Sequence, residues 1–262
     1  MSELREARVL LTGATGGIGH AIARELHSRG AELILTGRRA EVLRELAAET
    51  NGETIEADLS ERAGLERLVG EAGVVDVLVA NAGLPARGTL SHFDLDRIEL
   101  VMGVNLTSPI LLTRLLLDGM LERGRGHLVF ISSMAGKVPR SGSALYSANK
   151  FGLRGFAGSL RQDLHGTGVG VSTIFPGFIR GAGMFAEHVD QLPPGVGTST
   201  PEEVAEATAR AIERDQGEVD VAPLPVRAAG LLSGVAPDLV GLLNRRTGAA
   251  EIAVRARRPG ES

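Results

Sequence analysis

The first thirty residues carry a pattern that few folds accommodate: a short apolar run, a cluster of glycines and then a helical pattern. The run spans Val9–Thr12, glycines stand at positions 13, 16, 17 and 19, and AIARELHSRG follows with apolar residues three and four apart. Glycines let a backbone turn tightly and approach a ligand, and the free N–H groups at a helix start favour an anion such as pyrophosphate. A purely structural turn is the alternative, but the place of these glycines between a first strand and a first helix favours nucleotide binding.

The same alternation of strand and helix patterns continues along the chain. Strands alternating with helices predict a parallel sheet, and a continuous apolar run is typical of a strand buried on both faces. Ligand-binding residues of such sheets gather at the carboxyl ends of the strands. The sequence thus predicts a single α/β domain with its site at that edge. The six further strands are expected at Glu32–Thr36, Glu53–Ala57, Val75–Ala80, His127–Ile131, Val169–Phe175 and Glu218–Ala222.

A second constraint lies in a later helix, where Tyr146 and Lys150 stand four residues apart and therefore share one helix face. A neighbouring ammonium stabilises phenolate and lowers the phenol pKa from about 10, which suits a general acid and base at neutral pH. An ordinary surface pair is the alternative. However, 26 of the 28 basic residues are arginine, so a solvated position would be expected to carry arginine, and we interpret the pair as functional.

A long or broken helical region is predicted at Asp94–Arg123, with Asn105 in an apolar neighbourhood. A buried amide is costly unless it is paired. Asn105 is therefore either a satisfied core amide or a ligand for water or backbone near the site. Among helix starts, Ser60 is expected to cap one helix, and Thr200 with Glu203 forms a predicted capping box for another.

Composition excludes several classes of function. The 262 residues include no cysteine and six scattered histidines, and the net charge is −4. Neither a disulfide nor a metal site is expected, and nucleic acid is not indicated as a partner. The amino-terminal residues show no signal-peptide pattern, and no apolar run is expected to be long enough to cross a bilayer. We expect a cytoplasmic protein.

The carboxyl-terminal residues, 224–262, hold six arginines, three acidic residues and several leucines and valines. A packed helix with a frayed end is the first interpretation, and a membrane-surface or partner-docking role is the alternative. The helix that carries Tyr146 also contains Gly152, Gly155 and Gly158, which weaken a helix unless something packs closely against them. A partner subunit is one candidate.

Taken together, these motifs resemble the classical short-chain dehydrogenase/reductase family over residues 8–222. The glycine turn is similar to the cofactor turn of that family, and Asp58-Leu59, Asn81-Ala82-Gly83 and Pro176-Gly177 match its motifs after strands three, four and six. The resemblance implies a Rossmann-type, doubly wound parallel β-sheet of about seven strands with helices on both faces. It places one catalytic domain at residues 1–223 and a C-terminal helical, Arg-rich extension at 224–262. The matched catalytic set is Asn105, Ser133, Tyr146 and Lys150.

The resemblance also implies a role for each matched residue. Tyr146 would exchange a proton with the substrate oxygen while hydride moves to or from a nicotinamide, and Ser133 would hydrogen-bond that oxygen. Lys150 would contact the nicotinamide ribose and lower the pKa of Tyr146, and Asn105 would hold a water that links Lys150 to solvent. The expected cofactor-binding residues are Gly13, Thr15, Gly17, Ile18, Gly19, Arg38, Arg39, Asp58, Leu59, Asn81, Ala82, Gly83, Tyr146, Lys150, Pro176, Gly177 and Ile179.

The end of the second strand predicts which nicotinamide cofactor is used. NAD-binding relatives of this fold place a carboxylate there to bond the ribose hydroxyls. Here the strand ends Leu35-Thr36-Gly37, and Arg38-Arg39 follows directly. Arginine matches phosphate geometry with paired hydrogen bonds, so Arg38, assisted by Arg39 or Thr15, should hold the 2′-phosphate of NADP(H). NAD(H) is the less favoured cofactor, and a solvated helix start is the alternative interpretation of the two arginines.

Two departures from the family pattern affect what the resemblance implies. Gly181 stands where relatives often carry threonine near the nicotinamide amide, so other contacts would orient the ring. The usual Asp-Gly-Gly ending is absent, which weakens the case for a tetramer, while the glycine-rich helix face favours a homodimer.

The sequence leaves three functions open, of which an oxidoreductase is favoured. A non-catalytic nucleotide-sensing protein would not need Ser133 and Tyr146 together, and an epimerase or dehydratase relative would need a longer substrate domain. The expected pocket walls, Ala135–Ser143 and Gly181–Gly197, are interpreted as apolar. The expected substrate is accordingly an apolar carbonyl compound or alcohol. The apolar residues behind this expectation are Met134, Val138, Leu145, Met184 and Phe185.

Overall fold

Alternate side chains of each inner strand enter opposite layers of the core. In strand β1 (Arg8–Thr12), Val9 and Leu11 belong to one buried cluster and Leu10 to the other, and β4 (Val77–Ala80) divides its side chains in the same way. A strand that is apolar at every position therefore needs helices on both faces.

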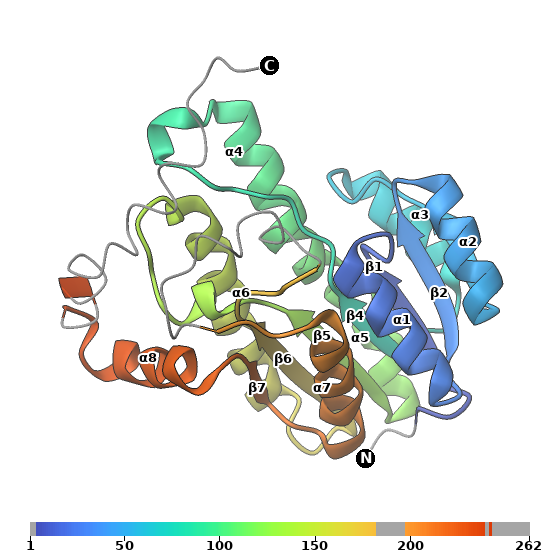
Figure 1. The fold of residues 1–262 in the computed structure, drawn as a ribbon. Helices are drawn as coiled ribbons and strands as arrows, with labels where there is room; N and C mark the ends of the chain where they lie inside the picture. Colours follow the sequence, from blue (N-terminus) through green and yellow to red (C-terminus); the bar gives the residue numbers. More distant parts are fainter. Residues whose placement is uncertain (1–3, 182–196, 239–240, 243–262) are drawn as a thin grey trace.

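The computed structural model describes residues 4–181, 197–238 and 241–242. Its seven strands form one parallel sheet in the order β3-β2-β1-β4-β5-β6-β7 (Figure 1). The chain starts in the middle of the sheet and winds first toward one edge and then toward the other, which confirms the predicted doubly wound fold. The other strands are β2 (Glu32–Gly37), β3 (Glu53–Glu56), β5 (Gly126–Ile131), β6 (Val169–Pro176) and β7 (Glu218–Val221).

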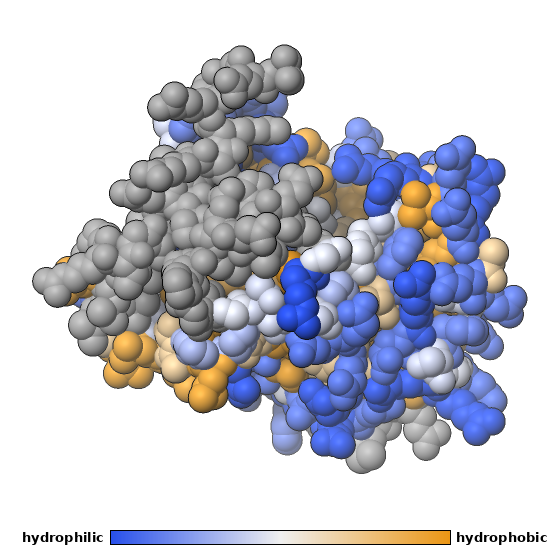
Figure 2. All heavy atoms as spheres, viewed as in Figure 1, coloured by the Kyte–Doolittle hydropathy of each residue, from blue (hydrophilic) through white to orange (hydrophobic). Residues whose placement is uncertain are grey.

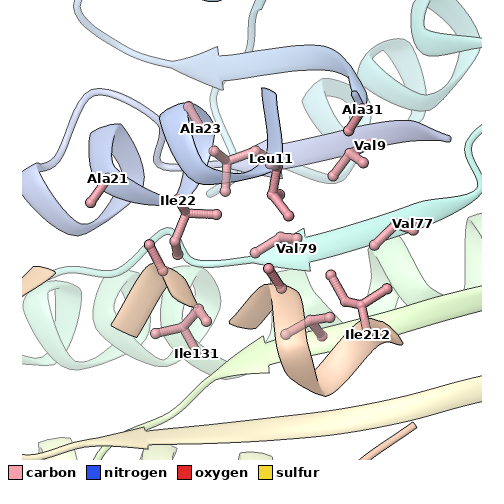
Figure 3. Packing of buried hydrophobic residues seen from close by; sticks show 14 of the residues in the cluster. Val9, Leu11, Ala21, Ile22, Ala23, Ala31, Val77, Val79, Ile131 and Ile212 are labelled. Carbon is pink, nitrogen blue, oxygen red and sulfur yellow. The ribbon is translucent and has the colours of Figure 1, made fainter. Parts of the chain in front are cut away.

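Three helices cover each face of the sheet. The first cluster holds buried residues of α1 (Gly17–Ser28), α2 (Ala40–Thr50) and α7 (Pro201–Arg214). Figure 3 shows how Ile22 of α1 and Ile212 of α7 lie over the central strands beside Val79. The second cluster holds residues of α3 (Arg62–Ala72), α5 (Ser108–Arg123) and α6 (Ala144–Asp163).

The two predicted helix caps have different outcomes. Thr200 and Glu203 form the expected capping box, since the Thr200 hydroxyl accepts from the Glu203 amide and the Glu203 carboxylate accepts from the Thr200 amide. The prediction for Ser60 is wrong, because α3 begins at Arg62. The amide and hydroxyl of Ser60 instead donate to the Asp58 carboxylate at 2.9 and 2.7 Å.

The helical region predicted at Asp94–Arg123 is one long, irregular stretch and is not broken. Helix α4 (Leu95–Met102) passes through a π-helical turn (Gly103–Thr107) into α5. By length and composition this 29-residue stretch could cross a membrane, so the expectation that no apolar run is long enough is wrong. Its apolar side chains supply core contacts: Leu112, Leu116 and Met120 lie in the second buried cluster, on one face of the sheet.

The predicted C-terminal extension begins with helix α8 (Leu224–Val235). The helix packs on the short helix η3 (Met134–Gly136), and a Cβ at Gly230 would lie 2.8 Å from the Met134 methyl. Its other face is apolar and open to solvent, as Figure 2 shows at the lower left, with Leu231 75% and Val235 87% exposed. Residues 239–240 and 243–262 of the extension lie outside the described residues, as do Met184 and Phe185 of the predicted pocket loop.

The glycines of α6 meet different surroundings. A Cβ at Gly152 would lie 3.0 Å from Leu106 of the π turn, so this glycine permits a close helix contact within the chain. A Cβ at Gly155 or Gly158 would meet no described atom within 4 Å. The partner subunit inferred from this stripe stays a prediction.

Candidate active site

A cavity of about 590 Å³ runs along the carboxyl ends of the strands, as predicted for a doubly wound sheet. It extends from the glycine turn and the end of β2 to the residues that follow β5 and β6. With one exception, Asn105, every predicted site residue lines it. The predicted residues in its wall are Gly13, Thr15, Gly17, Ile18, Gly19, Arg38, Arg39, Asp58, Leu59, Asn81, Ala82, Gly83, Ser133, Tyr146, Lys150, Pro176, Gly177 and Ile179.

The glycine turn between β1 and α1 has two positions that exclude any side chain. Gly13 has a φ of +65°, and a Cβ there would lie 2.7 Å from the Ala82 backbone. A Cβ at Gly19 would overlap the carbonyl oxygen of Gly13. The residue before α1 is Gly16, whose missing side chain leaves the helix start without a side-chain cap. The first N–H groups of α1 therefore remain available to an anion in the cavity.

Asn81, at the end of β4, holds the glycine turn in place. Its amide nitrogen donates to the carbonyl oxygens of Thr12 and Gly13, both at 3.1 Å. The Thr12 hydroxyl in turn accepts from the backbone amides of Asn81 and Ala82, both at 3.0 Å. Asn81 thus joins the ends of β1 and β4 and fixes the backbone that would face a cofactor.

The ends of β2 and β3 form the far end of the cavity. Arg39 donates a hydrogen bond to the carbonyl oxygen of Thr15 in the glycine turn, and Arg38 beside it is exposed. Hydrogen bonds from Ser60 hold the pKa of Asp58 below its usual value, so this carboxylate is ionised at neutral pH. This end offers two guanidinium groups and one anchored carboxylate to a ligand.

The other end of the cavity brings Tyr146 and Ser133 together. Ser133 follows β5, and Tyr146 lies in the first turn of α6. Burial raises the pKa of the Tyr146 phenol, while a hydrogen bond with Ser133 and the charges of Arg140 and Arg87 lower it. The phenol is therefore kept protonated at neutral pH but lies beside groups that stabilise its anion.

Lys150 lies one helical turn beyond Tyr146 and is 4% exposed. Its Nζ donates to the carbonyl oxygen of Ile131 at 2.8 Å and lies 5.7 Å from the centroid of the Tyr146 ring. Burial lowers the pKa of Lys150 to about 8. The shared helix face predicted for the pair is therefore present, but the cations that lower the pKa of Tyr146 here are Arg140 and Arg87.

Sequence reasoning missed both arginines. Arg140 lies within the predicted pocket wall Ala135–Ser143, for which the sequence predicts apolar side chains. Of those, Met134, Val138 and Leu145 are buried and lie outside the described cavity wall, where Arg140 and Ser143 stand. A charged residue six positions before Tyr146 in a segment expected to border the site is the signal that could have found Arg140.

Asn105 does not line the cavity. Its side-chain oxygen accepts from the Leu84 amide at 2.6 Å, and its side-chain nitrogen donates to the Leu84 carbonyl at 2.9 Å. Asn105 is thus a satisfied buried amide, as in the first interpretation, and a ligand for the backbone, as in the second. It clamps the segment that follows Gly83, while the water-holding role implied by the resemblance stays a prediction.

The segment after β6 completes the wall. The Gly177 amide donates to the Val221 carbonyl at 2.9 Å, and Ile179 pairs with Ser199. Gly181 has a φ of +74°, a conformation that threonine rarely adopts. The backbone conformation at this position therefore favours glycine over the threonine of the family pattern.

Comparisons with known proteins agree with this geometry. Residues 7–193 match the model of the short chain dehydrogenase family. The chain is 37% identical to the ketoacyl reductase HetN of Nostoc sp. over 86% of its length and 82% of that protein. It is also 37% identical to the NADP-dependent 3-hydroxy acid dehydrogenase YdfG of Salmonella typhi, over 76% of this chain and 86% of the other.

A solved structure shares the fold. The crystal structure of a metagenomic short-chain oxidoreductase in complex with NADP superposes with a TM-score of 0.70 at 32% identity. The match covers 84% of this chain and 97% of the other.

Proposed function

The chain belongs to the short-chain dehydrogenase family, and on that premise we propose that it is an NADP(H)-dependent oxidoreductase that interconverts a carbonyl group and an alcohol. The observation that carries the proposal is the meeting of Tyr146, Ser133 and Lys150 at one end of a cavity whose other end holds Arg38. The residues that line the cavity run from the ends of β2 and β3 to the ends of β5 and β6. A wall of this extent would border both halves of a dinucleotide.

Tyr146 is the proposed proton donor in the reducing direction and the proton acceptor in the oxidising direction. Its hydrogen bond with Ser133 aligns both hydroxyls toward one substrate oxygen. Arg140 and Arg87 stabilise the phenolate that forms when the proton leaves, because their positive charges act on the phenol oxygen from the same cavity wall. When bound, the nicotinamide supplies or accepts the hydride.

Lys150 is proposed to hold the ribose of the nicotinamide half. One of its three protons is used by the Ile131 carbonyl, and this bond fixes the ammonium in the cavity wall. Asn105 is proposed as a positioning residue, since its amide fixes Leu84 and thereby the loop after Gly83. The glycine turn and the uncapped start of α1 would hold the pyrophosphate.

The preference for NADP(H) is supported by the exposed guanidinium of Arg38 at the end of β2, with no carboxylate in Leu35-Thr36-Gly37. One relative carries NADP dependence in its name and a solved relative was crystallised with NADP. The names of the two curated relatives describe carbonyl reduction and alcohol oxidation, which support the reaction class.

The test is a screen of ketones, aldehydes and alcohols, followed at the absorbance of the reduced cofactor with NADPH, NADH and their oxidised forms. We expect turnover of at least one carbonyl class, with NADPH preferred over NADH. Cofactor binding without turnover of any compound in either direction would instead support a nucleotide-sensing protein and contradict the proposal.

A further inference from the structure

The substrate end of the cavity carries two guanidinium groups. Arg87 lies in the loop that follows β4, and Arg140 lies between η3 and α6; both line the cavity with Tyr146. Among the described residues of the wall, the one acidic side chain is Asp58, at the opposite end. The described part of the substrate end therefore carries positive charge, in contrast to the apolar pocket predicted from the sequence.

The two loops that carry these arginines are joined. The Gly88 amide donates to the Gly142 carbonyl at 2.9 Å, and both glycines have positive φ values, +126° and +66°. A side chain at either position would strain this connection. The bond places Arg87 and Arg140 on two segments of one wall, next to the reacting phenol.

Arg140 has a fixed position but no anionic partner among the described residues. Its guanidinium carbon lies 4.7 Å from the centroid of the Phe178 ring, which gives the cation a flat apolar support. None of the ion pairs between described residues includes it. Arg87 is engaged by an interaction of its own, so Arg140 is the main cation for an anionic ligand here.

Burial lowers the pKa of Arg140 and of Arg87, and the nearby Tyr146 opposes this effect in both. A partly buried guanidinium loses some of its hydration, which a charged hydrogen-bond partner can replace. A planar carboxylate fits such a group with two parallel hydrogen bonds. A neutral substrate would not replace the hydration that the guanidinium loses.

We propose that the substrate carries a carboxylate close to its reacting carbonyl or hydroxyl carbon, and that Arg140 binds this carboxylate with Arg87 assisting. The inference rests on the proposed function and names the substrate class of the same site: a short oxo acid or hydroxy acid. Because both arginines line the same cavity wall as Tyr146, a short acid whose carboxylate lies near the reacting carbon suits this end of the cavity.

The test compares an acid with its neutral ester. Acetoacetate takes up one hydride from NADPH and one proton to give 3-hydroxybutyrate and NADP⁺, and ethyl acetoacetate or the neutral thioester S-acetoacetyl-N-acetylcysteamine reacts identically without the charge. We expect kcat/KM for acetoacetate to exceed that for either neutral compound at least tenfold. In Arg140→Gln this preference should fall at least tenfold, mainly through KM, while Arg140→Lys keeps part of it.

The ratio of acid to ester separates substrate binding from effects on Tyr146. Loss of an arginine that only tunes the phenol would slow both compounds equally, leave the ratio unchanged and overturn the inference. Arg62→Gln is the matched control, since Arg62 is an exposed arginine paired with Glu66 on α3 and its loss should leave the ratio unchanged.

A binding measurement keeps the inference separable from the proposed function. With NADPH bound, 3-hydroxybutyrate cannot react, so calorimetry reports binding alone. We expect wild type to bind 3-hydroxybutyrate at least tenfold more tightly than its methyl ester, and Arg140→Gln to lose the difference. Equal binding of acid and ester would overturn the inference even if other carbonyl compounds are turned over, whereas absence of all turnover would contradict the proposed function.

Discussion

The ammonium nitrogen of Lys150 lies 5.7 Å from the ring centroid of Tyr146 and is tied to the carbonyl oxygen of Ile131, at the end of β5. This second contact connects α6 to the sheet through the site itself. The four-residue spacing sets the direction of Lys150, and the strand end fixes the position of its charge. A replacement must therefore reproduce both the charge and the compact shape of the ammonium.

We predict that Lys150→Arg lowers kcat/KM at least a hundredfold, although the charge is kept. A planar guanidinium is larger and cannot occupy the buried site of Nζ while still donating to Ile131. Steady-state kinetics check this, and Lys137→Arg is the matched control. Lys137 is the other lysine, 9% exposed and paired with Glu218 and Asp220, and its replacement should cost stability more than turnover. Activity of Lys150→Arg within threefold of wild type would remove Lys150 from the site.

Asn105→Ala should destabilise the protein by about 1–3 kcal/mol, because the amide and carbonyl of buried Leu84 both lose their partner. Turnover should also fall, because Leu84 follows Asn81 and Gly83 in the chain and its loss of position would disturb the cavity wall that they form. Urea unfolding measures the first effect and kinetics at saturating cofactor the second. An unchanged urea midpoint would show that the clamp contributes nothing to the fold.

Buried His127 should make the fold sensitive to acid. Its Nε2 lies 2.8 Å from the Ser172 hydroxyl, and burial lowers its pKa to about 4. The imidazole pKa is about 6.5 in the unfolded chain, so between pH 6.5 and pH 4 the unfolded chain binds a proton at His127 that the folded chain does not. The stability contributed by this group is therefore full above pH 6.5 and is lost as the pH falls toward 4. The loss from this group approaches about 3 kcal/mol.

The measurement is the free energy of unfolding at pH 7 and pH 4.5 in wild type and in His127→Gln, which keeps a polar group near Ser172. The decrease between the two pH values should be smaller in the variant. An equal decrease in both proteins would show that other groups cause the acid sensitivity.

The fold was predictable because its signals are local. Apolar runs, glycine turns and helix periodicity each predict one element, and their alternation predicts the parallel sheet. The site followed from the same logic, since Gly13 and Asn81 come directly after a strand and Ser133 comes two residues after one, and strand ends share one edge. The family model and the relatives confirm the family and the fold, and the roles of the site residues stay a prediction.

What could not be predicted depends on contacts between distant segments. The loops that carry Arg87 and Arg140 are joined by the hydrogen bond from the Gly88 amide to the Gly142 carbonyl, and no local pattern indicates it. Ser60 matched a capping residue, but the Asp58 carboxylate two positions earlier binds its amide and hydroxyl. The homodimer, the cytoplasmic location and the role of the C-terminal extension concern partners or surroundings outside a single chain, and they stay predictions.

Arg38→Ala should change the choice of cofactor. Loss of a charged hydrogen bond to a 2′-phosphate costs about 1.5–3 kcal/mol, so the ratio of kcat/KM for NADPH over NADH should fall roughly 10- to 150-fold. Arg44→Ala is the control, since Arg44 lies on α2 outside the cavity wall. Preference of the wild type for NADH would overturn the cofactor assignment.

The central claim is that Tyr146 moves the proton, and Tyr146→Phe tests it most directly, because the change removes one oxygen atom and leaves the ring. The distant glycine turn and Arg38 remain intact, so NADPH affinity measured by cofactor fluorescence should stay within about threefold of wild type. Single-turnover reduction of a substrate found in the screen should slow at least a hundredfold, the scale of lost general acid catalysis. A variant that binds NADPH normally and keeps most of its single-turnover rate would contradict the account.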